Sequence, residues 1–172
     1  MHIFLTGEIQ VGKSTVITKT LSLLNITPGG FKTYFGPDRG AKSRLLYMNA
    51  ADKPPVYHEG NAIARMVREE KPVILLEKFD VYGAELLRSS MSNARLILMD
   101  ECGNLEKSAH IFQREIFRCL DGDIPVFGVV KQDSYGWTDG IRNHPKVCLY
   151  TVTKENRDSL PLLLAEQFAN SI

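Results

Sequence analysis

The stretch that decides the fold is HIFLTGEIQVGKST, residues 2–15. Its first part, residues 2–6, is short and mostly apolar, as a buried strand is. A glycine follows, and after four further residues come a second glycine, a lysine and two hydroxyl residues. Residues 13–25 then have helical spacing. The stretch therefore predicts a strand, a tight loop and a helix in this order.

The loop fits the pattern G-x-x-x-x-G-K-[ST] at residues 7–14 without adjustment. Consecutive backbone N–H groups of such a loop can surround a phosphate, and the helix N-terminus also favours an anion. We expect Lys13 to reach the β- and γ-phosphates and act in catalysis, Ser14 to ligate Mg²⁺, and Thr15 to contact the α-phosphate. The predicted nucleotide-binding residues are Gly7, Glu8, Ile9, Gln10, Val11, Gly12, Lys13, Ser14 and Thr15.

A second candidate site ends another apolar run, in LILMDECGNLE, residues 96–106. Asp100 closes the run and is predicted to hold Mg²⁺ through a water. Glu101 follows and is the second predicted catalytic residue, because a carboxylate there could orient or deprotonate an attacking water. Glu106 is a weaker candidate, since we expect it at the start of a helix, where the helix dipole alone favours an acid. We expect the two strand tips to lie side by side.

Short apolar runs alternate with helix-length segments along the rest of the chain. This alternation implies an α/β fold in which a mostly parallel sheet lies between helices, with an antiparallel addition around residues 30–60. No repeat or linker is evident, so residues 1–172 are expected to form a single domain. The predicted strands are 30–35, 43–49, 72–79, 94–100, 124–130 and 147–152, and the predicted helices are 61–71, 81–93, 105–120 and 155–172.

The charge balance argues against two classes of partner. The chain has 21 basic and 20 acidic residues, a net charge of +1, whereas attraction to nucleic acid or to an anionic membrane needs a basic excess. No apolar run approaches the roughly 20 residues of a membrane span, and charged residues interrupt the N-terminus before a signal peptide could form. We therefore expect a cytoplasmic protein that acts on a nucleoside triphosphate and binds neither nucleic acid nor membrane.

With both sites located, the chain resembles the small nucleoside-triphosphatase family known from thermophiles and, in animals, as the cancer-related nucleoside-triphosphatase. The likeness lies in TGEIQVGKST (6–15), GFKT (30–33), LILMDECGNLE (96–106) and YTVTKENRDSLP (150–161). The resemblance implies a three-layer, RecA-like P-loop NTPase and Mg²⁺-dependent hydrolysis of ATP, GTP and other triphosphates to diphosphate and phosphate. It also implies loose base selectivity, and it gives Lys13, Ser14, Asp100 and Glu101 the roles described above.

The chain departs from that family in two places. Ile9 and Gln10 stand where the family usually has Pro-Gly, so either Gln10 adopts the backbone angles of that glycine or the loop shifts. Pro37 lies near the place where family members tend to carry an arginine. The remaining candidates to neutralise charge in the transition state are Arg39, Arg142 and Arg157.

Two other functions remain open at this point. A small nucleotide or small-molecule kinase would suit the size of the chain, although no arginine-rich lid is evident. A nucleotide-binding regulatory module with little turnover would signal through the loops at 36–44 and 132–140 to a protein partner that the sequence does not identify. The segment KQDS, residues 131–134, either lies near the base or ribose or is plain surface.

Overall fold

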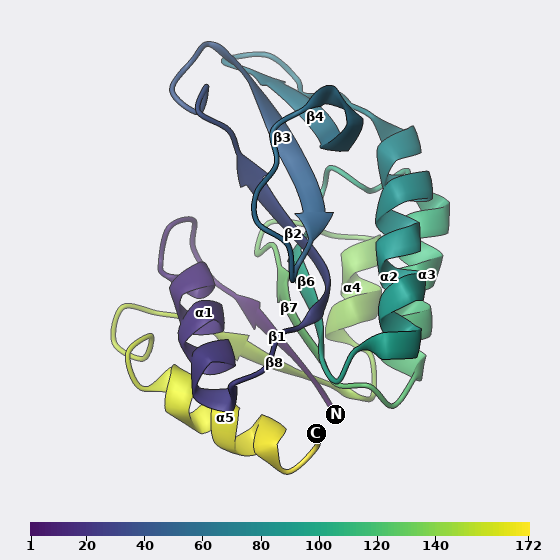
Figure 1. The fold of residues 1–172 in the computed structure, drawn as a ribbon. Coiled ribbons are helices and arrows are strands. Elements are labelled where there is room, and N and C mark those ends of the chain that lie inside the picture. Colours follow the sequence, from purple (N-terminus) through teal and green to yellow (C-terminus); the bar gives the residue numbers. More distant parts are fainter.

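A single mixed sheet runs through the molecule. In the computed structural model, which describes residues 1–172, its eight strands have the order β5-β4-β3-β2-β6-β7-β1-β8 (Figure 1). The fully buried strand β1 (His2–Thr6) pairs in parallel with β7 (Val126–Val130) and with β8 (Val147–Thr151). Strand β6 (Ile97–Cys102) pairs in parallel with β7 and with β2 (Gly29–Phe35). The predicted parallel sheet is therefore confirmed.

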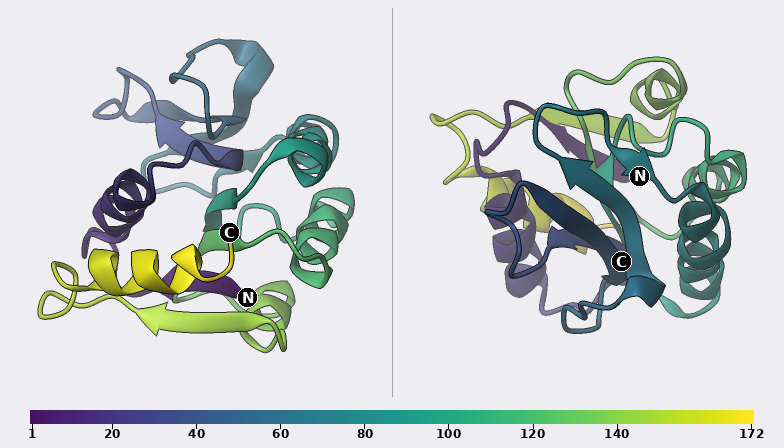
Figure 2. Two further views of the ribbon diagram at one scale, coloured as in Figure 1. Left: turned by 60° about the horizontal axis from the view of Figure 1, so that its bottom comes forward. Right: turned by 90° about the horizontal axis from the view of Figure 1, so that it is seen from above.

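Helices cover both faces of the sheet (Figures 1 and 2). One face carries α1 (Lys13–Leu24) and α5 (Leu160–Ala169), and the other carries α2 (Ala84–Asn93), α3 (His110–Asp121) and α4 (Trp137–Arg142). Neighbouring residues of β1 point to opposite faces, so Ile3 and Leu5 belong to one buried cluster and Phe4 to the other. This arrangement confirms the three-layer α/β fold. None of the helices has the length and apolar character that a membrane span requires.

The antiparallel addition is confirmed and is larger than expected. It joins β2 to β3 (Ser43–Ala50), β3 to β4 (Ala62–Val67) and β4 to β5 (Val73–Ile74), so it extends beyond residue 60. In Figure 1 it rises past the N-terminal end of α1. The antiparallel strands therefore lie beside the phosphate loop that precedes α1 (Figure 1).

Two elements of this region differ from the sequence prediction. The helix predicted over 61–71 is wrong: a short 3₁₀ turn (Glu59–Asn61) leads into β4, whose residues Ala62, Ile63 and Ala64 are all buried. Pairing with β3 overrides the helical preference of this alanine- and glutamate-containing segment. The strand predicted over 72–79 is reduced to β5, and a π-helix (Lys78–Gly83) leads into α2.

The strands that carry the two predicted sites are not neighbours, because β7 lies between β1 and β6. The expectation of side-by-side strand tips is therefore wrong. Hydrophobic runs identify strands but not their order in a sheet. Phe4 and Met99 are nevertheless both in register with Gly128 of β7. The two strand tips are thus level, separated by two strand spacings or about 10 Å.

Candidate functional site

The loop after β1 has the backbone of an anion cradle. Gly7 (φ 137°) and Gly12 (φ 117°) adopt conformations that side chains disfavour. A Cβ atom on Gly7 would lie 2.6 Å from the carbonyl oxygen of Val152, so only glycine allows the loop to pass this close to the end of β8. No side chain caps the N-terminus of α1, which leaves its first N–H groups for an anion.

The two residues that depart from the family pattern fit this loop. Gln10 has a φ of 62°, so it adopts the left-handed conformation that a glycine would take. Ile9 is 78% exposed, whereas Val11 is buried and anchors the loop in the core. Val11 therefore holds the loop against the core, while the side chain of Ile9 is exposed.

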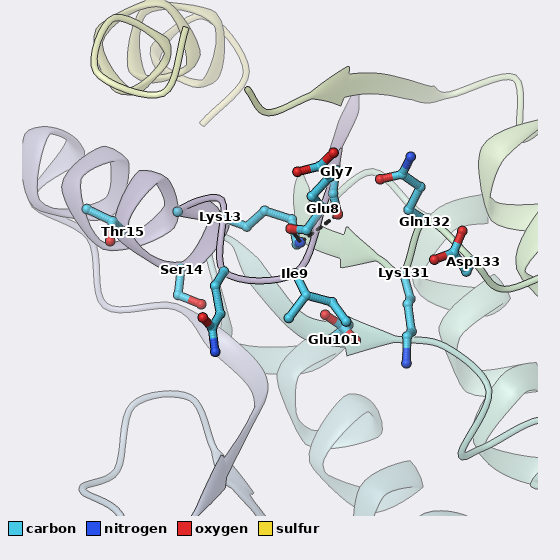
Figure 3. Close-up of a pocket in the computed structure, with 12 residues that line it drawn as sticks. Gly7, Glu8, Ile9, Lys13, Ser14, Thr15, Glu101, Lys131, Gln132 and Asp133 are labelled. Atoms are coloured by element: carbon cyan, nitrogen blue, oxygen red, sulfur yellow. Dashed lines mark hydrogen bonds between the residues drawn. The ribbon is translucent and has the colours of Figure 1, made fainter. Parts of the chain in front are cut away.

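The loop opens onto a cavity of about 920 Å³ (Figure 3). All the predicted nucleotide-binding residues line it except Val11. Glu101 lines it too, as do Lys131, Gln132 and Asp133 of the loop after β7. For the KQDS segment, residues 131–134, the cavity agrees with a place near the base or ribose of a nucleotide and not with plain surface.

Lys13 lies over the loop that precedes it. Its Nζ donates hydrogen bonds to the carbonyl oxygens of Gly7 and Glu8, both at 2.8 Å (Figure 3). Burial lowers the pKa of Lys13 below its usual value, and the negative charges of Glu101 and Asp100 oppose this shift. The ammonium group is therefore held against the loop, where its charge could pair with a phosphate bound there.

Asp100 and Glu101 lie at the end of β6 and are joined by a cis peptide bond. Thr33 of β2 donates a hydrogen bond from Oγ1 to the carbonyl oxygen of Asp100 at 2.9 Å. Burial and then the charge of Glu101 raise the pKa of Asp100 to about 6, while Lys13 and Lys32 lower it. Sequence reasoning missed Thr33 as a partner of Asp100, although it ends the GFKT stretch that supports the family resemblance.

The donor set fits Mg²⁺ that arrives with a nucleotide. Ser14 and Asp100 line one cavity, and a hydroxyl with a carboxylate is the hard-oxygen pair that Mg²⁺ uses together with phosphates and waters. No group of three or more His, Cys, Asp or Glu side chains could hold a metal ion by itself. The residues therefore match a Mg²⁺ site that protein and nucleotide form together, and they do not form a metal site without the nucleotide.

Glu106 does not lie at a helix N-terminus, because α3 begins only at His110. It is 3% exposed, and its Oε1 accepts a hydrogen bond from the Gly103 N–H at 2.6 Å. Burial raises the pKa of Glu106 to about 7, against the effect of that hydrogen bond. Trp137 donates from Nε1 to the carbonyl oxygen of Gly103 at 2.9 Å. The helix-dipole explanation is thus replaced by a role in fixing the loop after β6.

The three candidate arginines lie in different surroundings. Arg142 is 18% exposed and donates to the carbonyl oxygen of Lys131 at 2.6 Å, so it holds the loop after β7. Arg157 lines a small cavity with Gly12 and with Thr15, the residue predicted to contact the α-phosphate. Arg39 alone lines a cavity with both Asp100 and Glu101. Of the three, it is the candidate that shares a cavity with the predicted metal-binding and catalytic acids.

Comparisons with known proteins agree with this site and fold. A family model described as NTPase matches residues 2–164. The nucleoside-triphosphatase THEP1 of Thermofilum pendens is 28% identical, over 99% of this chain and 97% of that protein. The human cancer-related nucleoside-triphosphatase is also 28% identical, over 92% of each.

Two solved structures share the fold. The crystal structure of THEP1 from Aquifex aeolicus superposes with a TM-score of 0.76 at 20% identity, over 95% of this chain and 96% of that one. The solution structure of the human cancer-related nucleoside triphosphatase gives a TM-score of 0.71 at 24% identity, over 99% and 98%. The architecture predicted from the phosphate loop is thus confirmed over almost the whole chain.

Proposed function

The chain belongs to the NTPase family, and on this premise we propose that it hydrolyses nucleoside triphosphates to nucleoside diphosphate and phosphate. The reaction depends on Mg²⁺ and discriminates little between bases. One observation carries the proposal: Lys13 and Ser14 of the phosphate loop line the same cavity as Glu101. A buried valine, Val130, occupies the position before Lys131, where a guanine-reading loop would need an asparagine, which supports the loose base selectivity.

The roles of the residues follow from their chemistry. Loop N–H groups bind the phosphates, and Lys13 exchanges its two carbonyl partners for β- and γ-phosphate oxygens. Ser14 and Asp100 would hold Mg²⁺, which neutralises charge on these oxygens when bound. Glu101 accepts a proton from the water whose oxygen bonds to the γ-phosphorus, while the bond to the β–γ bridging oxygen breaks. Catalysis is then mainly positioning and electrostatics.

The test is phosphate release from ATP, GTP, CTP and UTP, with and without Mg²⁺. Lys13→Ala and Glu101→Gln should each lower kcat by roughly a hundredfold or more, as the loss of one transition-state contact does. Lys19→Ala is the matched control, because Lys19 is an exposed lysine of the same helix. It should keep the activity of the original protein.

Two outcomes would overturn the proposal. Glu101→Gln with unchanged turnover would remove the assigned base. A protein that binds triphosphates by calorimetry and releases no phosphate would be the regulatory module instead. We expect Glu101→Gln to retain triphosphate binding while it loses turnover, since Glu101 acts on water and not on the nucleotide.

A further inference from the structure

A second cavity, of about 420 Å³, adjoins the phosphate cavity. The two share Ser14, Glu101 and Lys131, and Asp100 lines the second one as well. These residues include those proposed to meet Mg²⁺ and the γ-phosphate. Arg157 lines a different cavity, with Thr15, the residue predicted to contact the α-phosphate. A molecule in the second cavity would therefore face the γ-phosphate from the side away from the nucleoside of the bound triphosphate.

The wall of the second cavity differs in character from that of the first. Seven of its sixteen lining residues are hydrophobic, against one of twelve in the phosphate cavity. Phe79 and Ile63 are almost completely buried, and the Tyr34 hydroxyl accepts a hydrogen bond from the Val56 N–H at 2.9 Å, so this wall is fixed. A water molecule that attacks the phosphate does not need a hydrophobic wall, whereas a flat apolar ring binds against one.

The charges of the second cavity nearly balance. Asp100, Glu101 and Glu106 are its acids, and Arg39 and Lys131 are its bases. A phosphorylated ligand would need an excess of cations here, as phosphate sites have. The cavity lacks that excess, and Mg²⁺ would occupy Asp100. A neutral ligand is therefore favoured over a nucleotide as the second occupant.

Polar groups remain available for the edges of such a ligand. Glu106 lines the cavity, and its Oε1 accepts one hydrogen bond, from the Gly103 N–H, although a carboxyl group can take part in several. Asn104 uses its Nδ2 to donate to the carbonyl oxygen of Asp133, which leaves its Oδ1 as an acceptor. A ring with N–H groups at its edge and a sugar with hydroxyls would match these partners.

We propose that the second cavity binds a nucleoside and that the protein transfers the γ-phosphate of a triphosphate to a ribose hydroxyl of that nucleoside. The transfer rests on the proposed function, because it uses the same triphosphate site. The hydroxyl oxygen bonds to the γ-phosphorus, and its proton passes to the Glu101 carboxylate. The bond from phosphorus to the β–γ bridging oxygen breaks, and the electron pair leaves on the nucleoside diphosphate. Hydrolysis is the same step with water as acceptor.

The experiment uses ATP labelled with ³²P at the γ-phosphate, Mg²⁺, and adenosine, guanosine, cytidine or uridine at millimolar concentration. Thin-layer chromatography separates labelled inorganic phosphate from labelled nucleoside monophosphate. We expect the label to reach at least one nucleoside. The 5′-monophosphates of the same four nucleosides, tested in parallel, should accept no label.

Met66 of β4 is half-buried and lines the second cavity but not the phosphate cavity. The larger side chains of Met66→Phe and Met66→Trp should therefore narrow the second cavity. Both should lower the ratio of transfer to phosphate release, Met66→Trp at least tenfold. Leu23→Trp, at an exposed position of α1, is the matched control and should leave the ratio unchanged.

Three results would overturn the inference while hydrolysis, and with it the proposed function, still stood. They are the absence of label in all four nucleosides, label only in products of the monophosphates, and an unchanged ratio in folded Met66 variants. Loss of all phosphate release in the unmodified protein would instead overturn the proposed function.

Discussion

Replacing His2 by glutamine should change how the stability of the protein depends on pH. His2 is fully buried, donates from Nε2 to the carbonyl oxygen of Leu120 at 2.8 Å, and accepts from the Val126 N–H at Nδ1 at 3.1 Å. A second proton, on Nδ1, would face that N–H group. Burial lowers the pKa of His2 from 6.5 to about 4, and the hydrogen bond to Leu120 opposes the shift. The nearby N-terminal amine, His144 and Lys146 lower the pKa further.

The sign and size of the effect follow from this shift. Between pH 6.5 and about 4 the unfolded chain binds a proton that the folded protein does not, so stability is lost as the pH falls through this window. At 1.36 kcal/mol per pKa unit the whole shift corresponds to about 3 kcal/mol, of which about 2 kcal/mol is lost between pH 7.5 and pH 5.0. Asp100 and Glu106, with pKa values raised to about 6 and about 7, act with the opposite sign. The wild-type curve alone therefore does not isolate His2.

The assay is urea unfolding of the original protein and of His2→Gln at pH 7.5 and pH 5.0, followed by circular dichroism. The variant should gain about 2 kcal/mol relative to the original protein on acidification, because the other titrating groups are common to both. Ile3→Val, a buried neighbour in β1 without a titrating group, should keep the same difference at both pH values. An equally constant difference for His2→Gln would refute the reasoning.

Three other changes probe the site. Arg39→Ala should lower kcat for ATP at least tenfold, because Arg39 lines a cavity with Asp100 and Glu101. Arg157→Ala should mainly raise KM, because Arg157 lines a cavity with Gly12 and Thr15. Steady-state kinetics in which Arg39→Ala mainly raises KM and Arg157→Ala mainly lowers kcat would contradict these assignments. Gly7→Ala should destabilise the protein by about 2 kcal/mol, because the new Cβ would lie 2.6 Å from the Val152 oxygen at a φ of 137°; unchanged urea unfolding would argue against the strained loop. Asp100→Asn should raise the Mg²⁺ concentration for half-maximal phosphate release by on the order of tenfold, and a metal titration that superposes on that of the original protein would remove Asp100 from the metal site.

The sequence predicted the phosphate loop well because its signal is local. Gly7 and Gly12 lie in the loop between a buried strand and a helix, Lys13 and Ser14 begin that helix, and the spacing of these residues is enough to predict the loop. The same holds for β6 and Asp100, since an apolar run that ends in an acid marks a strand tip. The roles of these residues in binding and catalysis stay predictions.

Features set by distant contacts escaped prediction. The sequence of strand β4 predicts a helix, because its residues favour helix and only pairing with β3 makes them a strand. The place of β7 between β1 and β6 depends on how helices connect the strands, which hydrophobic periodicity does not report. The role of Glu106 depends on the hydrogen bond from the Gly103 N–H, and Trp137 of the distant helix α4 holds the Gly103 carbonyl group. The assignment of residues 1–172 to one domain and the expected compartment stay predictions.

The most direct measurement of the central claim is a crystal structure with Mg²⁺ and the non-hydrolysable β,γ-imido analogue of ATP. Our account predicts loop N–H groups around the β-phosphate, Mg²⁺ at about 2.1 Å from the Ser14 Oγ, and the γ-phosphate between the Lys13 Nζ and the Glu101 carboxylate. An analogue bound away from the loop, or a metal ion that ignores both Ser14 and Asp100, would contradict it.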